Sequence, residues 1–220
     1  MSIAGLVLAA GGGSRYQGPT HKLLAPFGGR PLVVTALDAT LEAGFDEVVA
    51  VTGAVDFSAA LASQAKLLGY HVTICDARGT FATPARFPMA DEVVVGWPQR
   101  YLEAHGEELG PRDACCVLTH DPKFDIPAVL GALRTRVGYL GAMGSRRTQA
   151  QRAERLREAG CSDADLARLM APIGLDLGAR TPEETAVAIL AEILLLRSGR
   201  EGGSLRDASG PIHQGLEPIR

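Results

Sequence analysis

The segment CCVLTHDPKFD, residues 115–125, ends in a dense group of side chains that can do chemistry. Its apolar first half predicts a buried strand, and His120, Asp121, Lys123 and Asp125 follow directly. In open α/β sheets, ligands bind beyond the carboxyl ends of the strands, near the switch in strand order. We therefore predict a site here, with His120 and Asp121 as candidate catalytic residues and Lys123 as a candidate ligand-binding residue. An aspartate before a proline also fits a simple turn, so that structural alternative stays open.

A second strand end carries glycines and arginines, in the segment YLGAMGSRRT of residues 139–148. Glycine permits unusual backbone angles, and the amides that open the following helix can point at an anion. Arginine adds forked donors that match phosphate or carboxylate. If the arginines served no ligand, they would be an ordinary solvated helix face. The predicted anion site consists of Gly141, Gly144, Ser145, Arg146, Arg147 and Thr148.

Two further charged residues, Asp176 and Arg180, lie between glycines just before a predicted helix. The sequence TPEE marks the start of that helix, with Thr181 as N-cap, a proline in the first turn and Glu184 three residues after the cap. We interpret Thr181 and Glu184 as structural. Asp176 and Arg180 are candidates to face the same ligand as the two strand ends.

The chain opens with a glycine cluster, in the segment VLAAGGGSRYQGPTHK of residues 7–22. An apolar run, then glycines, then basic side chains are typical of a strand that feeds a phosphate-binding loop. The candidate nucleotide-binding residues are Gly11, Gly12, Gly13, Ser14, Arg15 and Lys22.

Strand and helix patterns alternate along the chain. Apolar runs predict strands at 3–10, 47–52, 71–76, 92–95, 114–119 and 137–140. Helical patterns cover 31–43, 57–68, 98–104, 127–135, 148–159, 164–170 and 182–197. This alternation predicts a Rossmann-like α/β fold, a mostly parallel sheet with helices on both faces, preceded by an N-terminal βα arm. Residues 200–220, rich in Gly, Ser and Pro, are predicted to form a loose C-terminal tail.

Residues 47–76 have the layout of a dinucleotide-binding βαβ unit, with Asp76 where a ribose-binding carboxylate would stand. The turn GAVDFS contains one glycine, and Val55 and Asp56 fill places where small residues would admit a pyrophosphate. Asp56 would also repel that anion, and Asp56 or Ser58 would cap the following helix. The pattern supports the topology and disfavours NAD binding.

The composition is that of an ordinary globular protein. The chain has 220 residues, 46% of them hydrophobic, and a formal net charge of −3, so nothing favours nucleic acid or a membrane as a partner. No export signal and no membrane span are predicted. The four cysteines form no Cys-x-x-Cys pair, which indicates a reduced, cytoplasmic protein, and no metal site is predicted. Cys115 and Cys116 are predicted to be core residues, on opposite faces of one strand.

Four motifs resemble the C-terminal Rossmann domain of the XdhC/CoxI family: ATPARFPMADEVVVGWP, LTHDPKFD, GAMGSRRT and PIGLDLGARTPEETAVAILAEI. The resemblance runs from about residue 53 to residue 213. It implies an accessory protein for molybdenum hydroxylases such as xanthine dehydrogenase or carbon monoxide dehydrogenase. Such proteins bind the molybdenum cofactor (molybdopterin), hold it for sulfuration by a cysteine desulfurase, and help to insert it into the client enzyme.

Residues 1–54 are similar to the start of the MobA/MocA-like nucleotidyltransferases. In that family the glycine loop and a basic pair hold a triphosphate, and Arg15 and Lys22 match the pair, with an extra QGPTH stretch before the lysine. Nucleotidyl transfer needs carboxylate-held magnesium. The family's aspartate-bearing middle and pterin-binding second half have no counterpart here, since the XdhC-like sequence takes over near Gly53. The usual N-terminal module of the XdhC/CoxI family has no counterpart either.

The junction between the two resemblances shares one strand, 47–52. The doubly wound order places strands 71–76 and 114–119 on either side of it. Strand 3–10 must then join a sheet edge, displace a neighbour or pair with a second copy of the chain, because an unpaired buried edge is costly.

The sequence thus predicts a truncated nucleotidyltransferase-like segment over 1–54 and an XdhC-like Rossmann domain over 47–199. The predicted function is molybdenum cofactor binding and maturation, as an accessory protein rather than a catalyst, with the loop 141–148 anchoring the phosphate of the pterin. The predicted partners are a molybdenum hydroxylase client, a cysteine desulfurase and a second copy of the chain. The alternatives are a molybdopterin cytidylyltransferase, which would bind a nucleotide, and a dinucleotide-binding oxidoreductase.

Overall fold

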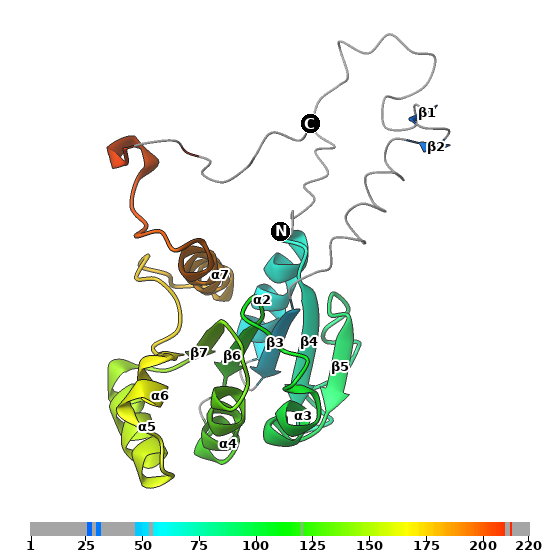
Figure 1. Cartoon of the computed structure of the whole chain (residues 1–220). Helices are drawn as coiled ribbons and strands as arrows, with labels where there is room; N and C mark the ends of the chain where they lie inside the picture. Colours follow the sequence, from blue (N-terminus) through cyan, green and yellow to red (C-terminus); the bar gives the residue numbers. More distant parts are fainter. Residues whose placement is uncertain are drawn as a thin grey trace.

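The computed structural model describes residues 26–27, 30–31, 47–52, 55–119, 121–209 and 212. Within these residues, the centre is a six-stranded parallel sheet with the order β5–β4–β3–β6–β7–β8 (Figure 1). Its strands are β3 (Glu47–Thr52), β4 (His71–Asp76), β5 (Glu92–Val95), β6 (Ala114–Leu118), β7 (Tyr139–Ala142) and β8 (Leu169–Met170). A short antiparallel pair, β1 (Pro26–Phe27) and β2 (Arg30–Pro31), forms a separate sheet. The predicted Rossmann-like α/β fold is confirmed.

Helices cover both faces of the large sheet (Figure 1). One face carries α3 (Pro98–His105), α4 (Pro122–Leu133) and α5 (Arg146–Glu158), and the other carries α2 (Val55–Leu67) and α7 (Pro182–Ser198). Each face has its own apolar cluster: Leu102, Val129 and Leu156 belong to one, Leu61 and Ile189 to the other. Two short elements complete the described chain: the helix α6 (Asp163–Ala167) and the 3-10 turn η2 (Leu205–Asp207).

The central strands are buried on both sides, which a parallel sheet between two helical layers requires. Cys115 packs in the cluster under α3, α4 and α5, and Cys116 packs in the cluster under α2 and α7. Both thiols are fully buried, and burial raises the pKa of Cys115 to about 12 and that of Cys116 well above its usual value. The prediction that these two cysteines are core residues on opposite faces is confirmed.

The strand order around β3 also follows the prediction. β3 pairs with β4 on one side and with β6 on the other, in parallel register. The predicted strand 3–10, the helix 31–43 that completes the N-terminal arm and the glycine cluster with Arg15 and Lys22 lie outside the described residues.

Two predicted helix starts are wrong because capping residues move them upstream. α4 begins at Pro122 rather than at 127, since Asp121 caps it and a proline suits the first helical turn. Pro127 lies inside α4, where its missing N–H removes one helical hydrogen bond. α5 begins at Arg146 rather than at 148, since Ser145 caps it.

The prediction of a single helix over residues 164–170 is wrong. The structure has α6, which ends at Ala167, and then the strand β8. Leu169 is buried and pairs beside Leu140 of β7, so sheet pairing and burial override the local helical pattern. β7 itself covers 139–142 rather than 137–140.

The termini of the helices on the other face complete the comparison. α7 has the predicted capping box, in which Thr181 and Glu184 satisfy each other's backbone N–H groups, and it ends at Gly199 with φ of 65°. α2 begins at Val55, so Asp56 and Ser58 lie inside its first turn and the prediction that either caps it is wrong.

No helix in the described part of the chain is both long enough and apolar enough to cross a bilayer.

Candidate functional site

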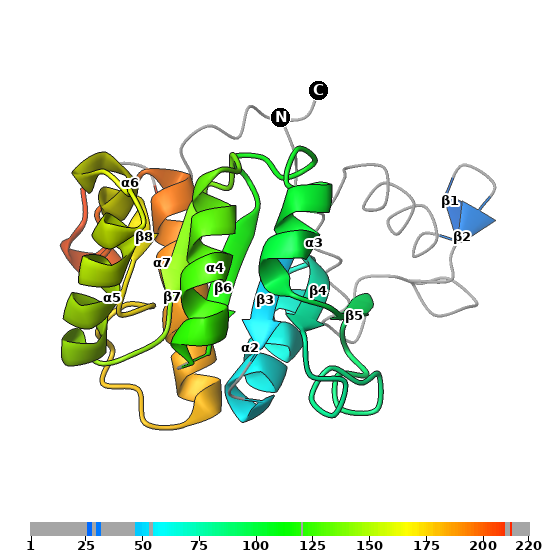
Figure 2. The same cartoon turned by 90° about the horizontal axis from the view of Figure 1, so that it is seen from below.

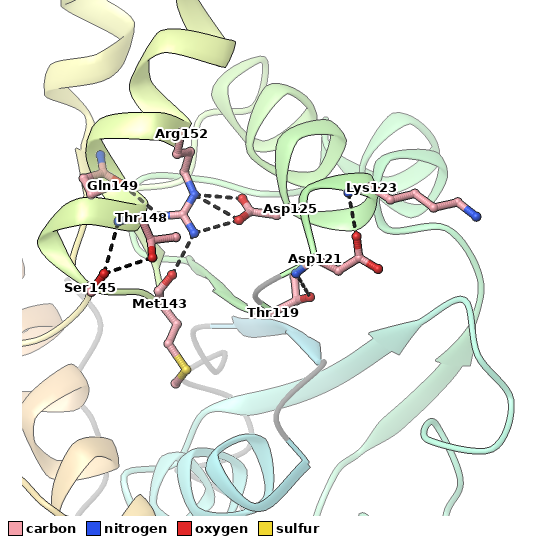
Figure 3. Close-up of polar contacts among 9 residues, drawn as sticks. All are labelled: Thr119, Asp121, Lys123, Asp125, Met143, Ser145, Thr148, Gln149 and Arg152. Atoms are coloured by element: carbon pink, nitrogen blue, oxygen red, sulfur yellow. Dashed lines mark hydrogen bonds and ion pairs between the residues drawn. The ribbon is translucent and has the colours of Figure 1, made fainter.

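The predicted site lies at the carboxyl edge of the sheet, where α4 and α5 begin. Figure 2 views the two helices side by side, with the loop that leads into α7 at the same end of the molecule. Figure 3 shows the residues of this edge, with Asp121 and Lys123 at the start of α4 and Ser145 and Thr148 at the start of α5. The topology therefore brings the two sequence motifs together, as predicted from the parallel sheet.

Asp121 is the N-cap of α4. Its Oδ1 atom accepts a hydrogen bond from the backbone N–H of Lys123 at 3.0 Å, and its own N–H donates to Thr119 Oγ1 at 3.2 Å. These contacts match the structural alternative that the sequence left open, and they account for the carboxylate without a catalytic role. His120, the other candidate catalytic residue, lies outside the described residues. A catalytic role for either residue stays a prediction.

The start of α5 is built around a left-handed glycine and a serine cap. Gly144 has φ of 146°, and Ser145 Oγ accepts from the backbone N–H of Thr148 at 3.1 Å and lies 3.0 Å from its Oγ1. Gly141 has no such angle: it lies inside β7, where a Cβ atom would meet Ile173 at 2.5 Å. The prediction that Gly141 supplies an unusual backbone angle is wrong, because close packing is what requires glycine there.

Arg146 and Arg147 occupy the first turn of α5 and are exposed. Neither side chain forms a hydrogen bond or ion pair with another described residue, and their backbone N–H groups have no acceptor among those residues either. The first turn of α5 thus presents two amides and two guanidinium groups to solvent. Since a helix N-terminus also carries a partial positive charge, this end can bind an anion.

A buried ion pair that the sequence analysis missed joins the two helices. Arg152 of α5 donates from Nη2 to Asp125 Oδ2 at 2.7 Å and from Nε to Asp125 Oδ1 at 2.8 Å, and both side chains are at least 95% buried. Arg152 also donates to the carbonyl of Met143 at 2.7 Å and to Gln149 Oε1 at 2.9 Å (Figure 3). Asp125 is therefore a structural residue that fixes α4 against α5.

A cleft of about 280 Å³ lies between the first turns of α4 and α5, with this ion pair in its wall. Its lining is mixed and largely polar, and consists of Pro122, Asp125, Ile126, Thr148, Gln151, Arg152 and Arg155.

Asp76, the candidate ribose-binding carboxylate, is buried and forms an ion pair with Arg78. The guanidinium donates from Nε to Oδ1 at 2.9 Å and from Nη2 to Oδ2 at 2.7 Å, and the backbone N–H of Arg78 donates to Oδ1 at 2.8 Å. Both carboxylate oxygens are engaged inside the protein. The dinucleotide alternative thus loses the acceptor on which its ribose would depend.

Arg78 leads into a row of cations and aromatic rings that the sequence analysis did not predict as a unit, because its members come from two loops and the first turn of α4. We call it the cation–aromatic row. Trp97 and Phe124 stack with centroids 5.1 Å apart, and Lys123 Nζ lies 5.3 Å from the Trp97 centroid. Its six members are Arg78, Phe81, Arg86, Trp97, Lys123 and Phe124. Among these members, the sequence analysis named Lys123 as a candidate ligand-binding residue, and Trp97 lies in a motif of the family resemblance.

Asp176 and Arg180 are exposed in the loop before α7. The backbone N–H of Arg180 donates to Glu184 at 2.7 Å, and no hydrogen bond or ion pair joins either side chain to the start of α5 among the described residues. The loop itself is held by Glu192, which accepts from Gly174 N–H at 2.9 Å and from Tyr139 Oη–H at 2.6 Å. A ligand-binding role for Asp176 and Arg180 stays a prediction.

Within the described residues, no three His, Cys, Asp or Glu side chains come together in a way that could hold a metal ion. The candidate nucleotide-binding residues, Gly11 to Lys22, lie outside those residues.

The doubly wound parallel sheet with helices on both faces defines a Rossmann-like domain. The sequence model of the XdhC Rossmann domain family matches residues 49–193, so the chain belongs to this family. The model of the MobA-like NTP transferase domain matches residues 5–86, and this match extends through β3, α2 and β4 into the stretch that the first model covers. Both family resemblances predicted from sequence are confirmed.

Known proteins resemble parts of the chain. An uncharacterized protein YqeB of Escherichia coli is 32% identical over 76% of this chain, and a probable xanthine dehydrogenase subunit of Bacillus subtilis is 31% identical over 62% of it. The molybdenum cofactor insertion chaperone PaoD of Escherichia coli is 34% identical over 41% of it. These matches span 30%, 39% and 29% of those proteins. A crystal structure of a xanthine dehydrogenase from Bacillus halodurans aligns with a TM-score of 0.59 at 25% identity, over 71% of this chain and 46% of that one.

Proposed function

We propose that this protein is an accessory factor for a molybdenum hydroxylase of the xanthine dehydrogenase or carbon monoxide dehydrogenase type. It binds the molybdenum cofactor, holds it for sulfuration by a cysteine desulfurase, and delivers it to the client enzyme. Membership of the XdhC Rossmann domain family supports this role. Relatives described as a molybdenum cofactor insertion chaperone and as part of a xanthine dehydrogenase support it as well.

The observation that carries the proposal is that Arg146 and Arg147, in the first turn of α5, have no partner among the described residues. The cofactor ends in a phosphate, and the two exposed guanidinium groups and the two backbone N–H groups, which have no acceptor in the part of the chain that the structure describes, match a phosphate in number and charge. Ser145 caps the helix through its Oγ and so orders this turn without filling it. The Asp125–Arg152 pair fixes the turn relative to α4.

The chain's residues would bind and orient the cargo rather than react with it. The first turn of α5 would hold the phosphate at the edge of the sheet, so that the rest of the cargo projects beyond the strand ends. The described part of the chain offers no reactive thiol at this edge, since Cys75, Cys115 and Cys116 are all buried in the core. Sulfur for the cargo would therefore come from the cysteine desulfurase. A second copy of the chain would complete the complex as a homodimer.

The proposal is tested by purifying the protein from cells that make the cofactor and measuring bound molybdenum and pterin per chain. We expect both in a fixed ratio to protein after gel filtration, and in the same ratio to each other as in the cofactor. A protein that emerges without molybdenum and pterin, and does not take up cofactor released from a donor enzyme, would contradict the proposal.

Nucleotidyl transfer is the second candidate, because the MobA-like model matches residues 5–86. We infer that the chain alone does not transfer CMP or GMP to molybdopterin, since Arg15 and Lys22 can hold a triphosphate but carboxylates must hold the magnesium that activates it. Pyrophosphate release is the measurement, with a no-enzyme control. Magnesium-dependent release above that control, abolished by Lys22→Ala, would establish the transferase instead.

A further inference from the structure

The cation–aromatic row runs along the carboxyl edge from the loop after β4 to the start of α4. Arg86 Cζ lies 5.8 Å from the Phe81 centroid, and Arg78 Cζ lies 4.4 Å from Phe81 and 4.9 Å from Phe124. Phe124 then stacks on Trp97 at an interplanar angle of 25°. Cations and rings therefore form a continuous row, built by the loop after β4, the loop before α3 and the first turn of α4.

The two ends of the row are open to solvent and its middle is fixed. Arg86 and Lys123 are exposed, while Phe81 and Trp97 are half-buried and Phe124 is buried. Arg78 is held by both oxygens of the buried Asp76 carboxylate, so its guanidinium plane cannot turn freely. A rigid row with exposed cations at both ends suits a flat, anionic ligand, because the exposed parts of Phe81 and Trp97 can contact its ring and Arg86 and Lys123 can meet its charge.

The same contacts select against a nucleoside. A ribose diol in a doubly wound fold relies on the acidic residue at the end of the second strand. Here that residue is Asp76, and its two oxygens already accept three hydrogen bonds from Arg78. The ligand class that remains is a planar heterocycle without a ribose.

We propose that the cation–aromatic row binds the planar ring system of a pterin, with Trp97 and Phe81 as stacking surfaces and Lys123 and Arg86 as the groups that meet its negative charge. This inference rests on the proposed function, which supplies a pterin as cargo. It places the ring beside the start of α4 and leaves the start of α5 for the phosphate.

The chain offers a direct reporter, because Trp97 is its one tryptophan. Pterin-6-carboxylate, a planar anionic pterin without phosphate or molybdenum, is titrated into the full chain while tryptophan fluorescence and pterin anisotropy are followed. We expect saturable quenching and a parallel rise in anisotropy. NAD, which needs the blocked ribose site, should compete poorly.

Variants assign the binding to the row. Trp97→Leu should weaken the binding of pterin-6-carboxylate, read by anisotropy, by about tenfold or more, and Trp97→Phe by less, because stacking survives. Lys123→Ala with Arg86→Ala changes only exposed residues and should weaken it roughly threefold or more. Arg206→Ala, which removes one exposed cation from η2, is the control and should bind like the parent. The proposal is overturned if no saturable quenching occurs, or if the Lys123/Arg86 variant binds as tightly as the Arg206 control.

Failure here is distinguishable from failure of the proposed function. The proposed function stands and this binding mode fails if the parent protein carries molybdenum and pterin after purification, but the Trp97→Leu and Lys123/Arg86 variants bind pterin-6-carboxylate as tightly as the parent. A protein that carries no cofactor, yet binds pterin-6-carboxylate through the row, keeps the row as a heterocycle site and loses the proposed cargo.

Discussion

Helices α4 and α5 both start at the carboxyl edge of the sheet, one after β6 and the other after β7, and each is capped by a polar side chain. At α4, both carboxylates are engaged within the protein: Asp121 caps the helix, and Asp125 forms a buried ion pair with Arg152. Lys123 is exposed, and its Nζ lies over the Trp97 ring. At α5, Arg146 and Arg147 have no partner among the described residues. The two carboxylates at the start of α4 are structural, and the first turn of α5 is available to an anionic ligand.

The difference shows that a cluster of reactive residue types does not by itself define a site. The segment after β6 has more chemically versatile residues than the segment after β7, but its carboxylates are used to build the fold. Side chains and backbone amides can bind a ligand only where the fold leaves them unpaired. Contacts between helices decide which groups are left unpaired.

The largest expected effect comes from breaking the pair that joins the two helices. Arg152→Ala leaves the buried Asp125 carboxylate without its cation, and should lower the free energy of unfolding by about 3–5 kcal/mol. Arg155→Ala, on the same helix but exposed, should change it by less than about 0.5 kcal/mol. Chemical denaturation of both variants is the measurement. If Arg152→Ala unfolds like Arg155→Ala, then the pair does not fix α4 against α5.

The two caps give the next largest effect and separate the helices by function. Asp121→Ala and Ser145→Ala should each cost about 1 kcal/mol of stability, because each leaves a first-turn N–H without its acceptor. Ser145→Ala should weaken cofactor binding more than Asp121→Ala, since it disorders the turn that we assign to the phosphate. Equal losses of cofactor affinity in both variants, measured beside their unfolding free energies, would break the contrast between the two helices.

The smallest expected effect concerns the cysteines. Cys75 and Cys115 have pKa values raised to about 12 by burial, and Cys161 is the half-buried one of the four. Native protein near neutral pH should therefore react with a thiol reagent at Cys161 alone. Cys75 and Cys115 have pKa values near 9 in the unfolded chain and about 12 in the folded one, so the stability that they contribute is fully present below about pH 9 and falls as the pH rises toward 12. Rapid labelling of Cys115 or Cys116 would show that the central sheet opens.

Much of the fold could be predicted from sequence, because its signals are local. The strands 47–52, 71–76 and 92–95 match the structure, since each is a short apolar run between turns. The Thr181–Glu184 capping box needs four consecutive residues and is confirmed. The start of α4 also carries a local signal, Asp121 before Pro122, but that pair fits a turn as well as a helix cap. The strand β8 could not be predicted from a local pattern, because it depends on pairing with β7.

The site could be predicted only as a location. The rule for parallel sheets pointed to the carboxyl edge, and the structure places Ser145 to Thr148 there. Arg152 and Asp125 are 27 residues apart, as are Trp97 and Phe124, and no local pattern links either pair. Which side chains are buried against each other and which are left free is decided by tertiary packing.

The affinity of the Arg146→Ala, Arg147→Ala double variant for the molybdenum cofactor tests the central claim most directly. Each charge-assisted hydrogen bond is worth roughly 1.5–3 kcal/mol, so its affinity should fall about a hundredfold or more while its unfolding free energy stays near that of the parent. The Arg157→Ala, Arg206→Ala double variant removes the same charge from exposed positions that do not line the cleft and should keep the parent affinity. If the Arg146/Arg147 variant binds cofactor as tightly as the parent, the first turn of α5 is a solvated helix face and does not hold the phosphate.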